Sequence, residues 1–403
     1  MTTEQIQSLI DRTAAANGGT ATVPAGDHHC GPLELKSGAR LVLEQGARIL
    51  AAWDVSAELP KGFITAAHAR DIEICGPGTI DARGGMDSFP KGTPHRPRGF
   101  HLHDCENVRI AGIHFRDAPS WGLHFSECTD LTIDGVTIDN HNNYNNDGID
   151  ISDCHGVRIT NCDISSDDDG IVIKSFTARG NRDIEVAHCT VGSHCNALKT
   201  GTESYGSFKN IEIHDCTVVP ARSETVYYGS VQGQSAICLT NVDGADLADV
   251  HVHDIEIRSG TRIPLCLRLG ARLRPYANDT PRPVGTFKKV TIENITAHNS
   301  LNSGYACTVA GVAVDGGTHY LENIVLRNLD LRFVGETAPT PADLVVAENP
   351  SSYPHPNILG ALPAYGLYCR HVKGLVLDSV NISHQGGAEN RPPVLCEDVQ
   401  ARR

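Results

Sequence analysis

The sequence is poor in aromatic residues and has no long hydrophobic run. Phe, Trp and Tyr make up only 5% of the 403 residues, and hydrophobic residues make up 40%. A large helical core is therefore not expected. A thin core of Val, Ile and Leu between short strands fits better, because the 39 glycines supply turns. No stretch approaches the roughly 20 apolar residues that span a bilayer, so no membrane partner is predicted.

The chain also lacks an excess of positive charge. It has 34 Lys and Arg against 48 Asp and Glu, which gives a formal net charge of −14. Nucleic acids and anionic membranes are bound by clustered Lys and Arg, so this balance argues against both as partners. An acidic substrate would need a local basic patch.

No secretory leader is recognisable in the first residues, so a cytoplasmic location with reduced thiols is expected. The 14 cysteines form no CxxC pair and no spacing typical of structural zinc. Two histidine pairs, His101 with His103 and His251 with His253, alternate along expected strands. No third ligand is evident for either pair, so neither a metal site nor a cofactor is predicted.

The first 20 residues are expected to form a capping helix, with Ile6, Leu9 and Ile10 at helical spacing and a stop at Asn17-Gly18-Gly19. Residues 21–400 then repeat one phrase, a polar residue followed by two short strands. Longer inserts near residues 220–235, 271–285 and 335–365 are expected to be loops over one face. The phrase recurs with a period of roughly 25 residues, and its matching positions include Val108, Leu131, Val157, Ile184 and Ile211. This period, without helices, predicts one all-β solenoid of parallel coils over residues 1–403. The cysteines recur at fixed positions of the repeat and are interpreted as small buried side chains.

Two acidic turns stand out in adjacent repeats. Asp147 precedes one apolar strand, and Asp168 and Asp169 precede the next, about one coil later. A single Asp-rich turn is usually only solvated. Two such turns in register would stack their carboxylates, raise at least one pKa and place a general acid beside a general base.

These residues and their neighbours resemble glycoside hydrolase family 28, the polygalacturonase and rhamnogalacturonase group, in its bacterial branch. The similar segments, in order, are GPGTIDARG at 76–84, APSWGLHF at 118–125, Asn145-Asn146-Asp147-Gly148, and Asp168-Asp169-Gly170 with its following strand. The resemblance implies a right-handed parallel β-helix and hydrolysis with inversion. It also implies that Asp168 is the general acid and that Asp147 and Asp169 activate water, which agrees with the chemistry of inversion.

The sequence departs from the family pattern at two places. The family's Gly-His-Gly is replaced by Ser193-His194-Cys195, where His194 is a candidate catalytic residue that would tune the acid. The family's Arg-x-Lys, which grips a galacturonate carboxylate, is missing from SAICLTNVDG. Trp121 is interpreted as a core anchor rather than a sugar platform. The candidate substrate-binding residues are Asn145, Lys174, Lys199, Glu203, Arg268 and Arg272.

The function predicted is an inverting glycoside hydrolase acting on a plant-type oligosaccharide, pectic or related. Two alternatives stay open: a polysaccharide lyase with a Ca²⁺–carboxylate cluster, and a non-catalytic carbohydrate-binding β-helix. The sugar, the linkage, the endo or exo mode and the oligomeric state are not predicted.

Overall fold

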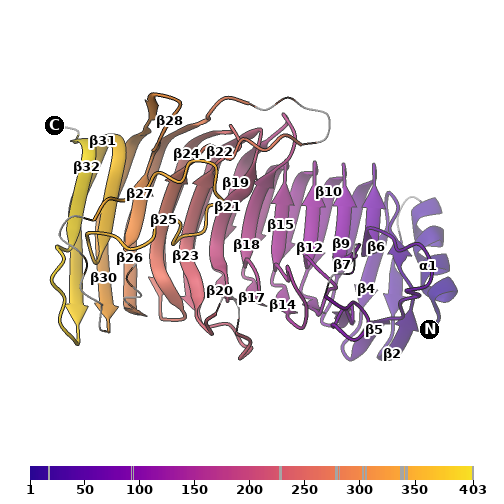
Figure 1. The fold of residues 1–403 in the computed structure, drawn as a ribbon. Helices are drawn as coiled ribbons and strands as arrows, with labels where there is room; N and C mark the ends of the chain where they lie inside the picture. The colour runs from indigo at the N-terminus through magenta and orange to yellow at the C-terminus, as the bar shows by residue number, and fades with distance from the viewer. Residues whose placement is uncertain are drawn as a thin grey trace. The chain divides into compact units, whose positions relative to one another are not determined.

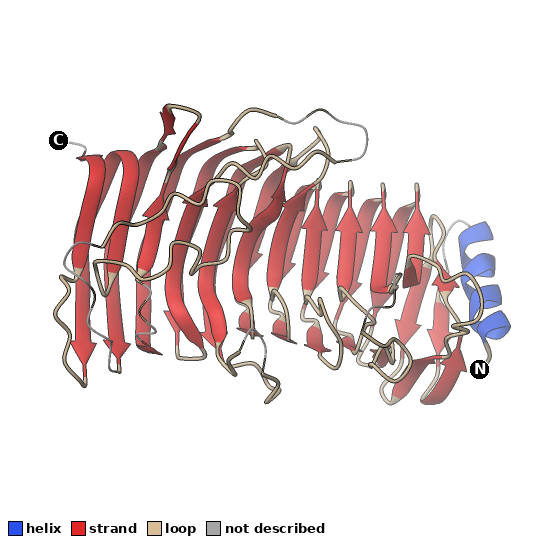
Figure 2. Ribbon diagram, in the orientation of Figure 1, coloured by secondary structure: helices blue, strands red, loops and turns tan. Residues whose placement is uncertain are grey.

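A computed structural model describes residues 1–16, 19–91, 93, 95–226, 229–276, 280, 282–301, 304, 306–335, 340 and 344–401. Its residues fall into two compact units, and each is described by itself. Unit 1 comprises residues 1–172, 184–192 and 221–225; unit 2 comprises residues 173–183, 193–220 and 226–403. Within the described residues, strands dominate both units, and the one helix belongs to unit 1 (Figure 2). That helix is not long and apolar enough to cross a membrane.

Helix α1 (Thr3–Ala15) covers the first strands of unit 1, as expected of a cap (Figure 1). A capping box begins it: Thr2 Oγ1 accepts from Gln5 N–H, and the Gln5 side chain accepts from Thr2 N–H. Ile6 and Ile10 are fully buried, and the helix contacts strands β1 (Ala21–Val23), β3 (Leu33–Glu34) and β4 (Arg40–Leu43). The helix ends at Ala15; Asn17 and Gly18 of the predicted stop lie outside the described residues.

The strands of unit 1 form three parallel ladders, and each successive coil adds one strand to each ladder. The first ladder is β1 (Ala21–Val23), β4 (Arg40–Leu43), β7 (Arg70–Cys75), β10 (Glu106–Ala111), β13 (Thr129–Asp134) and β16 (His155–Thr160). The second is β2 (Gly26–Cys30), β5 (Ala47–Ala51), β8 (Thr79–Asp81), β11 (His114–Arg116), β14 (Thr137–Asn140) and β17 (Asp163–Ser166). The third is β3 (Leu33–Glu34), β6 (Gly62–Ala67), β9 (Arg98–His103), β12 (Leu123–Ser126) and β15 (Ile149–Ser152).

Sequence register and structural register agree in this unit. Val108 pairs with Leu131, and Leu131 pairs with Val157, as the repeat predicts. The polar residue that begins each phrase adopts a positive φ at Asn107 (53°) and Asp130 (53°), and Gly156 (67°) takes the same place one coil later. Asn, Asp and Gly tolerate this left-handed conformation best, so the polar position marks a corner of the coil.

Unit 2 is also built mainly of parallel strands, most of which are longer. One series is β22 (Ser207–Val219), β24 (Asp246–Ile257), β26 (Thr286–Leu301), β30 (Leu321–Val334), β31 (Leu367–Gln385) and β32 (Val394–Ala401). A second series, β21 (Asn196–Ser204), β23 (Gly233–Asn241), β25 (Thr261–Leu269) and β27 (Cys307–Ala310), joins the start of β31. Unit 2 also contains the antiparallel pair β28 (Val312–Val314) and β29 (Gly317–His319). Strands β18 (Ile171–Ser175), β19 (Asn181–Ala187) and β20 (Thr190–Ser193) each contain residues of both units. The prediction of a parallel β-helix is confirmed.

All 14 cysteines lie in described positions and are free thiols. Most are buried, and several donate weakly to backbone carbonyls, as Cys128 Sγ does to Leu102 O at 3.5 Å. This confirms their interpretation as small buried side chains.

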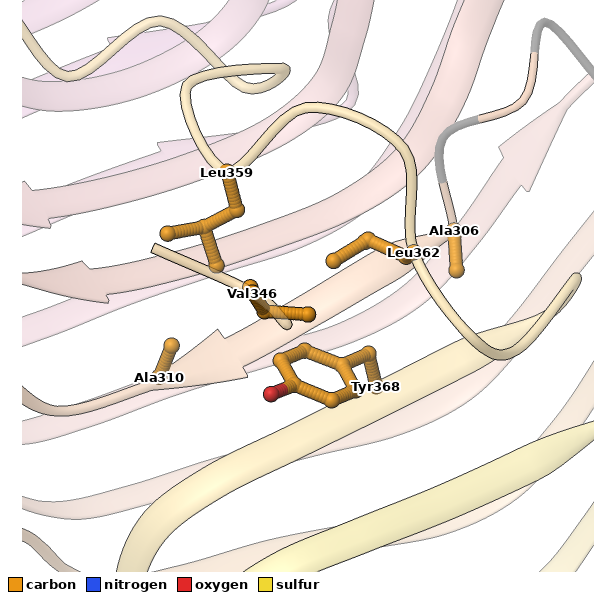
Figure 3. Close-up of a cluster of buried hydrophobic side chains, with 6 residues drawn as sticks. All are labelled: Ala306, Ala310, Val346, Leu359, Leu362 and Tyr368. Carbon is orange, nitrogen blue, oxygen red and sulfur yellow. The ribbon is translucent and has the colours of Figure 1, made fainter. Parts of the chain in front are cut away.

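The described part of the predicted insert near residues 335–365 packs on unit 2 rather than extending from it. Val346, Leu359 and Leu362 lie over Tyr368 together with Ala306 and Ala310 (Figure 3). Residues 336–339 and 341–343 lie outside the described residues. This segment therefore has a structural role, because it buries apolar surface on β27 and β31.

The contact between α1 and the first coil yields a stability prediction. Replacing Ile10 by Ala should lower the free energy of unfolding by about 2–5 kcal/mol, because it removes buried methyl groups. Ser8→Ala, at an exposed position on the same helix, should change it by less than about 0.5 kcal/mol. Chemical denaturation of both variants measures the difference. Equal stability of the two variants would contradict the capping role of α1.

Candidate active site

The two acidic turns lie in register within unit 1. Gly122 N–H donates to Asp147 O at 2.9 Å, and Gly148 N–H donates to Asp169 O at 2.8 Å. Trp121, Asp147 and Asp169 therefore occupy the same position on three successive coils, about 4.8 Å apart from coil to coil. The register predicted for Asp147 and the Asp168–Asp169 pair is confirmed.

The glycines after Trp121 and Asp147 are required by close packing. A Cβ on Gly148 would lie 2.5 Å from Gly170 O and 2.6 Å from Ile164 Cγ2. A Cβ on Gly122 would lie 2.5 Å from Gly148 O. The glycines let adjacent coils approach at the start of the third ladder, and this fixes the preceding residues in one row.

Three buried asparagines hold the turn that carries Asp147. Asn140 Nδ2 donates to Asp147 O at 2.7 Å, and Asn146 Nδ2 donates to Ala118 O at 2.8 Å. Asn143 N–H donates to Asn146 Oδ1 at 2.7 Å. Because these groups are buried and hydrogen-bonded, they hold the turn rigidly and keep its backbone groups satisfied.

Arg96, which lies two coils toward the N-terminus, clamps the same turn. Its guanidinium donates to Pro119 O at 2.9 Å, to Asn143 Oδ1 at 3.2 Å, to Asn145 Oδ1 at 2.7 Å and to Tyr144 O. The side-chain oxygen of Asn145, a predicted substrate-binding residue, is thus engaged by Arg96. Sequence reasoning missed Arg96, because no repeat or motif marks a residue in the loop before β9.

The three consecutive aspartates differ in their surroundings. Asp167 Oδ1 accepts from His141 Nδ1 at 2.6 Å and from Ser223 Oγ at 2.8 Å, so Asp167 anchors the turn. Asp168 Oδ1 accepts from Asp169 N–H at 3.0 Å. Asp147, Asp168 and Asp169 are 2%, 7% and 3% exposed, which rejects the interpretation of solvated turn residues. Buried carboxylates on adjacent coils are the arrangement in which one group retains a proton while another stays ionised.

Trp121 corrects an expectation. It was interpreted as a core anchor, but it stands in the row with Asp147 and is only partly buried. Its ring meets His124 edge-on, with centroids 5.0 Å apart. The sequence carries a signal for this row, because Arg98-Gly99, Trp121-Gly122, Asp147-Gly148 and Asp169-Gly170 recur as one residue before a glycine.

The family assignment rests on a match over more than half of the chain. The model of glycosyl hydrolases family 28 matches residues 16–225, which include every residue of this row. This chain belongs to glycosyl hydrolase family 28.

Curated polygalacturonases match parts of the chain. An endo-polygalacturonase of Pectobacterium carotovorum is 25% identical over 217 residues, which cover 46% of this chain and 54% of that protein. A probable polygalacturonase of Arabidopsis thaliana is 30% identical over 192 residues, covering 44% of this chain and 41% of that protein. The matched region thus spans about half or less of the length of these curated relatives.

Solved structures share the fold at low identity. A family 28 exopolygalacturonase of Yersinia enterocolitica superposes with a TM-score of 0.73 at 16% identity, covering 100% of this chain and 75% of that one. A surface adhesin of Streptococcus pneumoniae reaches a TM-score of 0.64 at 14% identity, covering 97% and 95%. These likenesses concern the β-helix alone, because an enzyme and an adhesin share it.

The remaining predicted site residues belong to unit 2. His194 is 1% exposed, and its Nδ1 lies 3.0 Å from Val231 O. Because a carbonyl only accepts, Nδ1 carries the proton of this hydrogen bond. Lys174 and Lys199 are 3% and 4% exposed. The role of His194 in catalysis and the roles of Lys174 and Lys199 in substrate binding remain predictions.

Two arginines of unit 2 are engaged within that unit. Arg268 donates to Gly311 O at 2.8 Å and to Glu348 O at 2.5 Å, and burial lowers its pKa to about 10. Arg272 pairs with the fully buried Asp243, with Nε to Oδ1 at 2.9 Å, and lies 3.7 Å from a Glu203 oxygen. Through these contacts both arginines stabilise the fold of unit 2. A role in substrate binding remains a prediction for Arg268, Arg272 and Glu203.

The glycine row yields a prediction with a matched control. Gly148→Ala should lower the free energy of unfolding by about 1–3 kcal/mol, because the new Cβ would meet the Gly170 carbonyl. Gly85→Ala, where nothing lies within 4 Å of the new Cβ, should leave stability nearly unchanged. Thermal unfolding of the two variants tests this. If Gly148→Ala melted with the parent protein, the packing argument for the row would fail.

Proposed function

We propose that this family 28 protein is an inverting glycoside hydrolase that acts on a plant-type oligosaccharide, pectic or related. The observation that carries the proposal is the set of three buried carboxylates, Asp147, Asp168 and Asp169, on adjacent coils of unit 1. The names of the relatives, most of them polygalacturonases, support the substrate class.

The proposed reaction uses the three carboxyl groups in two roles. Protonated Asp168 donates its proton to the glycosidic oxygen as the bond from that oxygen to the anomeric carbon breaks. Asp147 and Asp169, both ionised, hold a water and take its proton while its oxygen attacks the anomeric carbon from the opposite face. The products are two shorter sugars, and the new hemiacetal has the inverted configuration.

The surroundings of the carboxylates support this division. Asp167 is occupied by His141 and Ser223, so it serves as an anchor and not as a reactant. The Asn140 side-chain amide donates to the backbone carbonyl of Asp147, and this contact fixes the backbone from which the Asp147 carboxylate extends. A rigid pair of acid and base on opposite sides of a sugar is the requirement of inversion.

Asp168→Asn tests the proposal. The substitution removes the proton donor while keeping the shape, so kcat on oligogalacturonates should fall by about 10²- to 10⁴-fold. Asp87→Asn, the same change at an exposed aspartate, should leave kcat unchanged. Products formed in ¹⁸O-water are read by mass spectrometry, and their anomeric configuration by NMR. Full activity of Asp168→Asn, or an unsaturated product absorbing in the ultraviolet, would refute the hydrolase mechanism.

A further inference from the structure

Arg98 extends the active-site row by one coil toward the N-terminus. Gly99 N–H donates to Trp121 O at 2.9 Å, and Phe100 pairs with Leu123. Arg98, Trp121, Asp147 and Asp169 therefore occupy one position on four successive coils. Side chains at equivalent positions of parallel strands point to the same face, so Arg98 belongs to the surface that carries the aspartates.

The guanidinium of Arg98 lies on the ring of Trp121. Its central carbon is 4.8 Å from the Trp121 ring centroid, and its Nε is buried and has no hydrogen-bond partner among the described residues. Burial lowers the Arg98 pKa, whereas Asp150 and Asp147 oppose this shift. A guanidinium offers five N–H donors in a planar fork, and leaving such donors unused in a buried setting is costly.

Arg96 provides a contrast two positions away. Its guanidinium donates to four oxygens of the protein, as described above, and is saturated by the Asn143–Asn145 turn. Arg98 has the same chemistry but no such partners within the described residues. Arg96 is thus a structural clamp, and Arg98 is available to a ligand.

The environment of Arg98 favours an anion on its N-terminal side. Arg98 pairs in register with Gly62, and Arg98 N–H donates to Lys61 O, so Lys61 lies on the preceding coil, one position before the row. Lys61 and Arg98 both act electrostatically on His101, so Lys61 is a second cation of this region. His101 is neutral, because burial, together with Arg98 and Lys61, lowers its pKa to about 3. Asp147 and Asp150 lie two coils away in the other direction, so a negative group would be held on the side of Lys61.

We propose that Arg98, Lys61 and Trp121 form a subsite for the carboxylate of a uronic acid unit, on the N-terminal side of the aspartates. The planar fork of Arg98 matches a carboxylate, and the ring of Trp121 lies against the guanidinium and positions it. This inference rests on the proposed function, and it supplies the cation that the missing Arg-x-Lys would otherwise provide.

The test compares free and methyl-esterified oligogalacturonates, which differ in the charge at the sugar carboxyl. Arg98→Gln should raise KM for the free acid by at least tenfold, leave kcat within about threefold, and leave KM for the methyl ester unchanged. Arg98→Lys should restore part of the loss, because it keeps the charge. Arg70→Gln, at an exposed position on β7, is the matched control and should behave like the parent. Equal losses on both substrates, or no loss on the free acid, would refute the subsite.

Calorimetric binding separates this subsite from the hydrolase proposal. Asp168→Asn should bind the free acid more tightly than the methyl ester, and adding Arg98→Gln should abolish that preference. If the parent hydrolyses no pectic oligosaccharide but shows this preference, the proposed function fails and the subsite stands. If hydrolysis occurs and Arg98→Gln changes neither binding nor KM, the subsite fails alone.

A separate cluster in unit 2 carries a second inference. Glu212 on β22 pairs in register with His251 on β24, and His253 lies on the same face two positions further on. One ligand atom from each of Glu212, His251 and His253 lies within 4.8 Å of the others. The sequence showed the two histidines but not the third group, because Glu212 lies on the preceding coil, before the predicted insert near 220–235.

The outer nitrogens of both histidines are already held by carboxylates. His251 Nε2 lies 2.9 Å from Glu293 Oε1, and His253 Nδ1 lies 2.6 Å from Asp254 Oδ2. The inner nitrogens, His251 Nδ1 and His253 Nε2, lie 3.7 and 3.3 Å from Glu212 Oε1. Metal-binding histidines are commonly oriented in this way, with one nitrogen on a carboxylate and the other toward the ion.

The separations between the two histidine nitrogens and the Glu212 oxygen suit a small cation of intermediate Lewis-acid softness. With bonds of about 2.0–2.1 Å, the ligand atoms of a tetrahedral Zn²⁺ site lie about 3.4 Å apart, close to both nitrogen–oxygen separations. We infer that Glu212, His251 and His253 form a binding site for a Zn²⁺-like divalent cation that links two coils of unit 2. Water would complete the coordination, since nitrogen and carboxylate ligands suit zinc, nickel and copper.

Calorimetry of the chelator-treated full chain with Zn²⁺ tests this site. One Zn²⁺ per chain should bind at micromolar or tighter affinity at pH 7.5 and raise Tm. Affinity should weaken at least tenfold at pH 5.5, because protons compete with the metal ion for the ligand atoms. His253→Ala should abolish this binding, and His29→Ala, at an exposed position in unit 1, should not. Absence of saturable binding, or equal binding by both variants, would refute the site.

Discussion

The hydrogen bond from each row glycine to the carbonyl of the next coil is the constraint on which the candidate active site depends. It aligns Arg98, Trp121, Asp147 and Asp169 without involving their side chains. The preceding residue can therefore change while the scaffold stays the same. The glycines themselves cannot change freely, because a Cβ at Gly122 or Gly148 would meet a carbonyl oxygen of the next coil. The residue before each glycine is thus free to carry a functional side chain, and the glycine itself permits the close packing of adjacent coils.

The fold and the aspartates could be predicted because both follow the repeat. In unit 1 the period varies little, so Val108, Leu131 and Val157 fall into register from the sequence alone. The Asp147 and Asp169 positions follow from the same count. The pairing of Glu212 with His251 could not be read in this way, because the coil between them is lengthened by an insert whose extent no repeat fixes.

The roles of the cations could not be predicted, because they depend on the hydrogen bonds of each guanidinium and not on residue type. Arg268 and Arg272 resembled substitutes for the missing Arg-x-Lys, but carbonyl oxygens and the buried Asp243 engage them. Arg96 and Arg98 are nearly adjacent in sequence, but Arg96 donates to the 143–145 turn and Arg98 does not. Only the folded turn therefore shows that Arg96 is structural and that Arg98 is the candidate ligand-binding residue. The loop before β9 does not follow the repeat, so the sequence gives no periodic signal for its contacts and only the structure shows them.

The polar support behind Asp147 explains how three carboxylates can be buried close together without collapse of the turn. Asn140, Asn143 and Asn146 are neutral amides, and they satisfy backbone groups without adding charge near the carboxylates. A cation in their place would favour ionisation of all three acids, which would remove the proton donor that inversion needs. The guanidinium of Arg96 is taken up by oxygens of the 143–145 turn, Arg98 lies in the row two coils before Asp147, and Lys61 lies on the coil before Arg98. In the proposed mechanism, substrate charge would therefore be recognised on coils that precede the turns holding Asp147, Asp168 and Asp169.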